Sequence, residues 1–176
     1  MRNRFDSQLE ILNNGIIEMG AMVEESLNSS IEALLKFNKP LAQKVIVGDK
    51  DIDQKMKDIE TLCLRLLLSQ QPVARDLRLI SASLKMVSDL ERIGDQAADI
   101  SEIIFEASEA DGFPARLSAI PPMGAATVKM LTQSVDAFVR KDLDLAHHVI
   151  DSDDEVDAGF TAAKKELIES IRNNSN

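Results

Sequence analysis

The residues with the clearest potential for chemistry are acidic side chains that interrupt an apolar helical stripe. Aliphatic residues form this stripe up to Val87, but its continuation carries Glu91 and Asp95, with Asp99 at its margin. Residues four apart on a helix are neighbours, so these like charges repel one another. A hard cation held by carboxylate oxygens would remove that repulsion. The pattern therefore predicts a metal site that includes Glu91, Asp95 and Asp99.

The preceding helical segment offers two more carboxylates. Asp49 lies on its apolar side and Asp53 follows one turn later along the flank, so both are further candidate metal ligands. Gly94 interrupts the acidic row at a cost of about 0.5–1 kcal/mol relative to Ala, which predicts a close approach of another helix there. An alternative stays open, in which all these acids belong to solvated faces and pair with Arg92, Lys85 or Lys57.

Helical periodicity predicts that five helices position these acids. The composition agrees, because Trp and Tyr are absent and a core of Leu, Ile, Val, Met and Ala is typical of helices. Asn38 is a predicted N-cap, Gly48 is a candidate bend, and Gln70-Gln71-Pro72 and Ala110 to Pro114 are predicted breaks. The expected helices run from Phe5 to Leu35, from about Pro40 to Ser69, from after Pro72 to before Ala110, from about Pro121, and from about Asp142.

The sequence contains an internal repeat, which appears when it is compared with itself at a shift of 104 residues. Met19-Gly20-Ala21 then falls on Met123-Gly124-Ala125, and the pair Asp49 and Asp53 falls on Asp153 and Asp157. Shared helical periodicity can align apolar positions, but it does not align two aspartates as readily. We therefore expect an all-α fold made of a duplicated three-helix unit.

The two repeats are expected at residues 1–110 and 115–176, and the second contains only two helices. Two amphipathic helices without a third leave apolar surface exposed, and such surface is usually covered by another subunit or domain. A homo-oligomer, with a dimer as its simplest form, is the resulting prediction.

Composition and charge limit the compartment and the partners. The 176 residues carry a formal net charge of −10, which disfavours binding to nucleic-acid phosphates. The single Cys63 lies in an apolar run and is predicted to be a reduced core residue. The first ten residues contain no apolar signal region, and no apolar run is long enough to span a bilayer. A cytoplasmic protein is expected.

The same acidic row carries a resemblance to a known family. Residues 88–100, SDLERIGDQAADI, resemble the signature D-x-E-R-I-G-D-x-A-x-N-I of the PhoU family, and residues 71–78, QPVARDLR, are similar to the stretch that opens the same helix in that family. The resemblance covers essentially the whole chain. It implies a tandem three-helix-bundle fold and metal binding by E/D-x-x-x-D motifs, with Glu91 and Asp95 as ligands in the first repeat.

The resemblance also implies a function and partners. PhoU proteins regulate bacterial phosphate uptake and phosphate-responsive signalling, often as negative regulators, and link a phosphate ABC transporter to a membrane sensor histidine kinase. The implied cofactor is a divalent or ferric ion of Mn, Mg, Zn or Fe, and attachment to the membrane would be peripheral, through protein partners. This chain departs from the family at Asp99, where the family usually has Asn. The second copy of the motif belongs on a sixth helix, which the sequence given does not include.

Other functions are less well supported by the residues. A metal-free helical adaptor that acts by surface contacts remains the alternative. A histidine phosphotransfer domain could use His147 or His148, but no Lys or Gly follows at the next turn to support a phosphoryl group. A di-iron carboxylate enzyme needs two Glu-x-x-His pairs, and none is present. No nucleophile set, phosphate loop or Cys cluster is found either, so an enzyme is not predicted.

Overall fold

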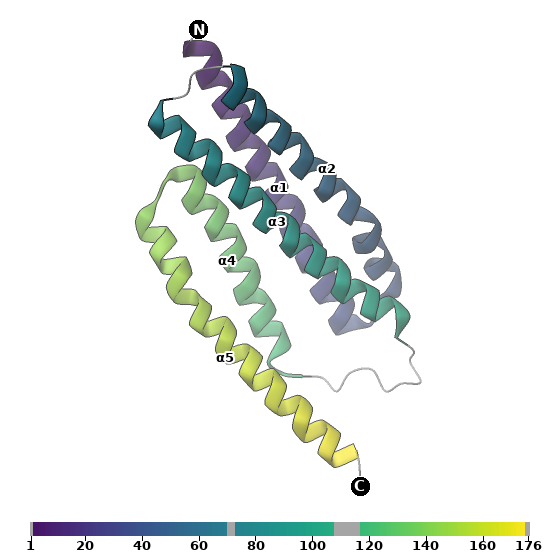
Figure 1. Ribbon diagram of the computed structural model, residues 1–176. Helices are drawn as coiled ribbons and strands as arrows, with labels where there is room; N and C mark the ends of the chain where they lie inside the picture. Colours follow the sequence, from purple (N-terminus) through teal and green to yellow (C-terminus); the bar gives the residue numbers. More distant parts are fainter. Residues whose placement is uncertain (1, 70–72, 108–116, 175–176) are drawn as a thin grey trace.

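Five long helices make up the protein in a computed structural model, which describes residues 2–69, 73–107 and 117–174. The helices are α1 (Arg2–Lys36), α2 (Lys39–Ser69), α3 (Ala74–Glu106), α4 (Ile120–Arg140) and α5 (Leu143–Asn174) (Figure 1). The predicted all-α fold is confirmed. The predicted breaks at 70–72 and 110–114 lie outside the described residues, and α2 runs without interruption through Gly48.

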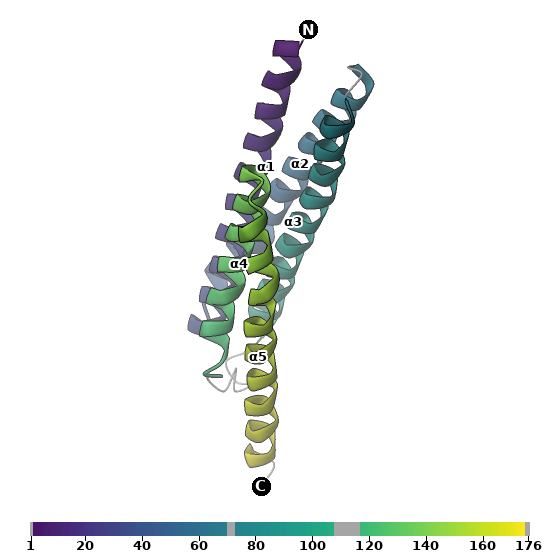
Figure 2. The same ribbon diagram turned by 90° about the vertical axis from the view of Figure 1, so that its left-hand side faces the viewer.

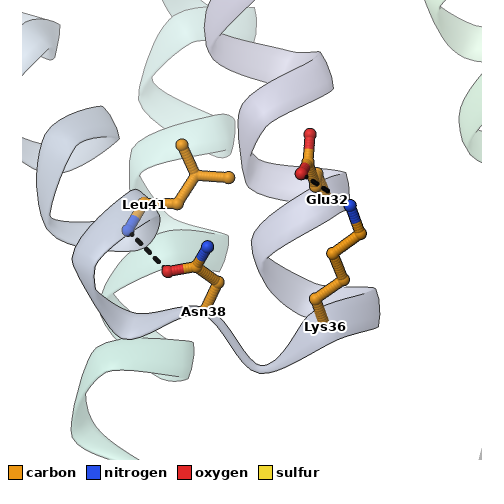
Figure 3. Close-up of polar contacts among 4 residues, drawn as sticks. All are labelled: Glu32, Lys36, Asn38 and Leu41. Carbon is orange, nitrogen blue, oxygen red and sulfur yellow. Dashed lines mark hydrogen bonds and ion pairs between the residues drawn. The ribbon is translucent and has the colours of Figure 1, made fainter.

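The turns at which α1 meets α2 and α4 meets α5 have the same construction. Phe37 and Lys141 both adopt left-handed backbone angles, with φ of 50° and 57°. The next residue caps the following helix: Asn38 Oδ1 accepts the Leu41 N–H at 3.1 Å (Figure 3), and Asp142 Oδ1 accepts the Leu145 N–H at 2.9 Å. These positions are 104 residues apart, so the repeat extends to backbone conformation and capping.

The main core lies among α1, α2 and α3. α3 packs against both α1 and α2, and its row of buried residues faces them. Leu12, Ile16, Met19, Val23, Ile80 and Val87 are all fully buried there. Burial of such side chains contributes about 1.5–3 kcal/mol each, so this three-helix unit supplies much of the apolar stabilisation.

A tight, symmetric contact joins the two repeats through α1 and α4. A Cβ added to Gly20 would lie 2.9 Å from Val135, and one added to Gly124 would lie 2.9 Å from Ile31. Gly20 corresponds to Gly124, and Ile31 to Val135, so each contact is the counterpart of the other. The two helices run antiparallel and are related by a local two-fold axis (Figure 1).

α5 is the outermost helix of the second repeat. It packs on α4 and extends past the first residue of α4 at its carboxyl-terminal end (Figures 1 and 2). It also carries exposed apolar residues such as Ile150 and Phe160. Within the described residues, no helix is both long and apolar enough to cross a bilayer.

Candidate metal centre

Three of the five predicted ligands come together between α2 and α3. Asp49 and Asp53 lie one turn apart on α2, and Asp95 lies opposite on α3. One carboxylate oxygen of each residue lies within 4.8 Å of those of the other two. Three oxygen ligands from two packed helices, each half-buried, suit a hard cation such as Mg²⁺ or Mn²⁺.

Gly94 allows α2 and α3 to approach closely beside these carboxylates. A Cβ at Gly94 would lie 3.1 Å from Ile52 Cδ1 and 3.8 Å from Asp49 Oδ1. Gly94 and Ile52 are both buried, so the two helix backbones meet within the acidic row, between Glu91 and Asp95. This close approach agrees with the expectation from the sequence, and it fixes the separation between Asp49 and Asp95.

Glu91 and Asp99 occupy the two ends of the acidic row on α3. Glu91 is half-buried, and burial is the largest cause of its raised pKa. The negative charges of Asp95, Asp53 and Asp49 raise this pKa further. Asp99 is exposed and accepts a hydrogen bond from Gln96 Nε2 at 3.3 Å. The structure therefore brings Glu91 to the edge of the cluster and leaves Asp99 further out.

Asp49 is the acidic residue of the cluster with the least favourable surroundings for a charged carboxylate. Its Oδ1 is buried and has no hydrogen-bond partner within the described part of the chain. Burial and the charges of Asp95, Asp53, Asp99 and Glu102 raise the pKa of Asp49, in that order of importance. A buried acceptor without a partner is destabilising, and a bound cation would satisfy it. The carboxylates therefore fit a hard metal ion.

Two basic side chains on α3, Lys85 and Arg92, pair with Asp89, which is outside the acidic row. Lys85 Nζ pairs with Asp89 at 2.6 Å, and Arg92 approaches the same carboxylate at 3.8 Å. Arg92 lowers the pKa of Glu91 only as the smallest of five influences. These two contacts do not support the alternative in which Lys85 and Arg92 neutralise the acidic row.

One contributor was not among the predicted ligands. Glu102 is exposed on α3, seven residues after Asp95, and its charge helps to raise the pKa of Asp49. The spacing of four and then seven residues along one helical stripe is the signal that identifies it. Glu102 acts here at longer range than Asp95 or Asp53.

The corresponding acids of the second repeat form no comparable cluster. Asp153 and Asp157 are exposed on α5, and the only group of three potential ligands among the described residues is that of Asp49, Asp53 and Asp95. His147 and His148 are also exposed on this helix. Fold and site together define a class of all-helical proteins built from repeated bundles, with a carboxylate cluster between the second and third helices of a repeat.

Comparisons with known proteins identify the family. A model of the PhoU domain matches residues 16–104 and 120–176. The chain is 36% identical over 165 residues to the phosphate-specific transport system accessory protein PhoU homolog of Pseudomonas aeruginosa, covering 94% of this chain and 68% of the relative. The homolog from Clostridium acetobutylicum is 38% identical, with 95% and 76% covered. The chain belongs to the PhoU family.

Solved structures of the family agree with the fold. The crystal structure of PhoU from Pseudomonas aeruginosa superposes with a TM-score of 0.90 at 34% identity, covering 97% of this chain and 82% of that one. The phosphate transport system regulatory protein PhoU from Streptococcus pneumoniae gives a TM-score of 0.87 at 28% identity, covering 96% and 79%. The resemblance inferred from residues 88–100 is confirmed.

Proposed function

We propose that this protein regulates phosphate uptake and phosphate-responsive signalling in the cytoplasm, as a metal-binding helical adaptor between a phosphate transporter and a sensor kinase. Membership of the PhoU family supports the phosphate-transport part, because curated relatives are named as accessory proteins of the phosphate-specific transport system. The names of these relatives also describe accessory or regulatory proteins, which favours a role other than catalysis.

The observation that carries the metal-binding part is the orphaned Oδ1 of Asp49 beside Asp53 and Asp95. In the proposed site these three residues hold a hard cation, and Glu91 completes the shell from the edge. The ion supplies positive charge that offsets the repulsion between α2 and α3. The protein's own contribution is to hold the oxygens at a fixed separation, through the packing of Gly94 on Ile52. The resulting rigid α2–α3 face is the proposed docking surface for a partner.

Metal binding can be tested by thermal unfolding with and without Mn²⁺, Mg²⁺, Zn²⁺ and Fe salts. At a metal concentration 100-fold above its Kd, a bound ion adds about 2.7 kcal/mol to the free energy of unfolding. We expect this gain for the unmodified protein and for Asp153→Asn plus Asp157→Asn, and its loss in Asp49→Asn plus Asp95→Asn. Equal unfolding curves with and without every metal would leave the metal-free adaptor as the function.

The regulatory part needs a cellular test. A bacterium whose own PhoU gene is deleted and which carries a phosphate-starvation reporter provides it. We expect expression of this chain to repress the reporter in high phosphate, and the Asp49→Asn plus Asp95→Asn variant to repress it less. Normal protein level with no repression by either form would contradict the proposed regulation.

A further inference from the structure

An exposed apolar patch lies where α2 ends and α3 begins, at the same end of the molecule as the amino terminus (Figure 1). Leu68 is 88% exposed and Val73 is 63% exposed, so these side chains project from the bundle. Contiguous apolar surface of this kind marks a site of contact with a protein or a membrane. The members of this apolar end patch are Leu64, Leu68, Val73 and Leu77.

The packing of α2 on α3 brings the members of the end patch together. The two helices run antiparallel and meet where Gly94 contacts Ile52. Counted in equal steps from that contact, Leu68 on α2 lies about level with Leu77 on α3, because each residue adds the same rise. Leu64 precedes Leu68 by one turn and shares its side of α2, which is turned away from the core. The patch therefore belongs to the first repeat and spans two helices.

The surroundings of the end patch are basic, although the chain as a whole is acidic. Residues 61–88 contain four basic side chains and one acidic side chain, whereas the whole chain has a net charge of −10. Arg75 and Arg78 are exposed in the first turns of α3, next to Val73 and Leu77. An apolar patch with a basic rim complements a surface that is apolar inside and anionic at its border.

An anionic bilayer fits this combination better than the groove of another protein. The patch sits at the end of a helical pair, where one flat surface can meet the last turns of α2 and the first turn of α3 together (Figure 1). The carboxylates of the candidate metal centre are too distant to oppose such a contact. Eleven residues along α2 separate Asp53 from Leu64, which is about 16 Å, and charges are screened over about 8–10 Å at physiological salt.

We propose that the end patch docks this protein on a bilayer that contains anionic lipid. The leucines enter the boundary between headgroups and acyl chains, and Arg75 and Arg78 pair with the lipid phosphates. The first repeat then stands on the membrane by one end, with the α2–α3 carboxylates held above the surface. This contact uses none of the proposed metal ligands and needs no protein partner, so membrane docking and the proposed regulation can fail independently.

Flotation with lipid vesicles tests the role of charge. We expect the full chain to float with vesicles of phosphatidylcholine and phosphatidylglycerol at low salt, and far less with phosphatidylcholine alone. Arg75→Gln plus Arg78→Gln should weaken binding about fivefold for each arginine. The matched control is Lys164→Gln plus Lys165→Gln, which removes two exposed charges near the other end of the molecule and should leave flotation unchanged (Figure 1).

The apolar contribution has its own pair of variants. Leu64→Ser plus Leu68→Ser should weaken binding to the same vesicles about tenfold or more. Ile103→Ser plus Phe105→Ser, at the far end of α3, removes two exposed apolar side chains and should not change binding. All four positions are exposed, and circular dichroism checks that the helix content of each variant is preserved.

Tryptophan fluorescence locates the contact, because the chain contains no native Trp or Tyr. The emission of Leu68→Trp should shift to the blue on addition of phosphatidylglycerol vesicles, whereas that of Ile103→Trp should not. Absence of flotation with anionic vesicles at low salt, or flotation indifferent to both patch variants, would overturn the proposal. Loss of reporter repression in the patch variants, without flotation of the unmodified protein, would assign the patch to a protein partner instead.

Discussion

Asp49 and Asp53 in the first repeat and Asp153 and Asp157 in the second are the same residues in the same register, yet their surroundings differ. The first pair is half-buried beside Asp95 of α3, and the second pair is exposed on α5. The helix that carries the pair does not by itself create the cluster. A packed third helix creates it, by contributing another carboxylate and by excluding water from Asp49.

The largest effects are expected where the two repeats are alike, at the α1–α4 contact. Gly20→Ala and Gly124→Ala each push a Cβ into a branched side chain that lies 2.9 Å away. Each should lower the free energy of unfolding by about 1–3 kcal/mol, and by similar amounts. Denaturant unfolding measures both. A large cost at one position and none at the other would break the symmetry described for this contact.

The next largest loss of stability is expected at a residue that is buried in the first repeat and only half-buried in the second. Val45 in α2 is 5% exposed, and its counterpart Val149 in α5 is only half-buried. Val45→Ala removes two buried carbons and should cost about 1.6 kcal/mol plus a cavity term. Val149→Ala should lower the free energy of unfolding by less than half as much. Equal losses at low protein concentration would show that the α5 side is as well covered as the α2 side.

Charge neutralisation separates the two aspartate pairs. Asp49→Asn removes repulsion from Asp53 and Asp95, at about 0.2–0.5 kcal/mol for each like-charged pair, so the metal-free protein should become more stable by about 0.5–1 kcal/mol. Asp153→Asn, at the exposed counterpart, should leave the midpoint of urea unfolding unchanged. A loss of stability in Asp49→Asn without metal would mean that the carboxylate has a stabilising partner.

The smallest change in stability is expected on replacing either of two glycines near the acidic site. A Cβ at Gly48 would meet nothing within 4 Å, so Gly48→Ala should stabilise α2 by about 0.5–1 kcal/mol. Gly94→Ala should gain less or lose stability, because its Cβ would lie 3.1 Å from Ile52. Thermal unfolding of the two variants side by side provides the measurement. A greater gain at position 94 would remove the close approach as the reason for that glycine.

The helices and the repeat were predictable because their signals are local and periodic. The N-cap predicted at Asn38 is present, and its counterpart Asp142 caps the helix that was expected to begin near that residue. Acidic residues singled out on both segments, Asp49, Asp53 and Asp95, lie together between α2 and α3. The sequence could not predict how deeply each acidic side chain is buried. Burial of Asp49 and exposure of Asp99 depend on how closely α3 packs against α2. The contact between Gly94 and Ile52 sets that separation.

The difference in burial between Asp49 and Asp153 could not be predicted from the sequence for the same reason. Periodicity places both residues on the same side of their helices, but it does not show whether a neighbour covers that side. The five-residue set predicted as ligands therefore contained a core of three, with Glu91 at the edge and Asp99 outside. Whether these residues hold an ion stays a prediction.

The antiparallel contact between α1 and α4 also determines how the two ends of the molecule could communicate. Among the described helices, α4 packs on α1 and α5, and α3 packs on α1 and α2, so α1 and α4 are the shared members. A change in the spacing of α2 and α3 can reach α5 through rigid-body shifts of α1 against α4. Two glycines and two branched side chains interlock there, so a shift of α4 along α1 would take Val135 and Ile31 off the glycines that make room for them. Among the described helices, α1 and α4 are therefore the one pair through which the two repeats are joined.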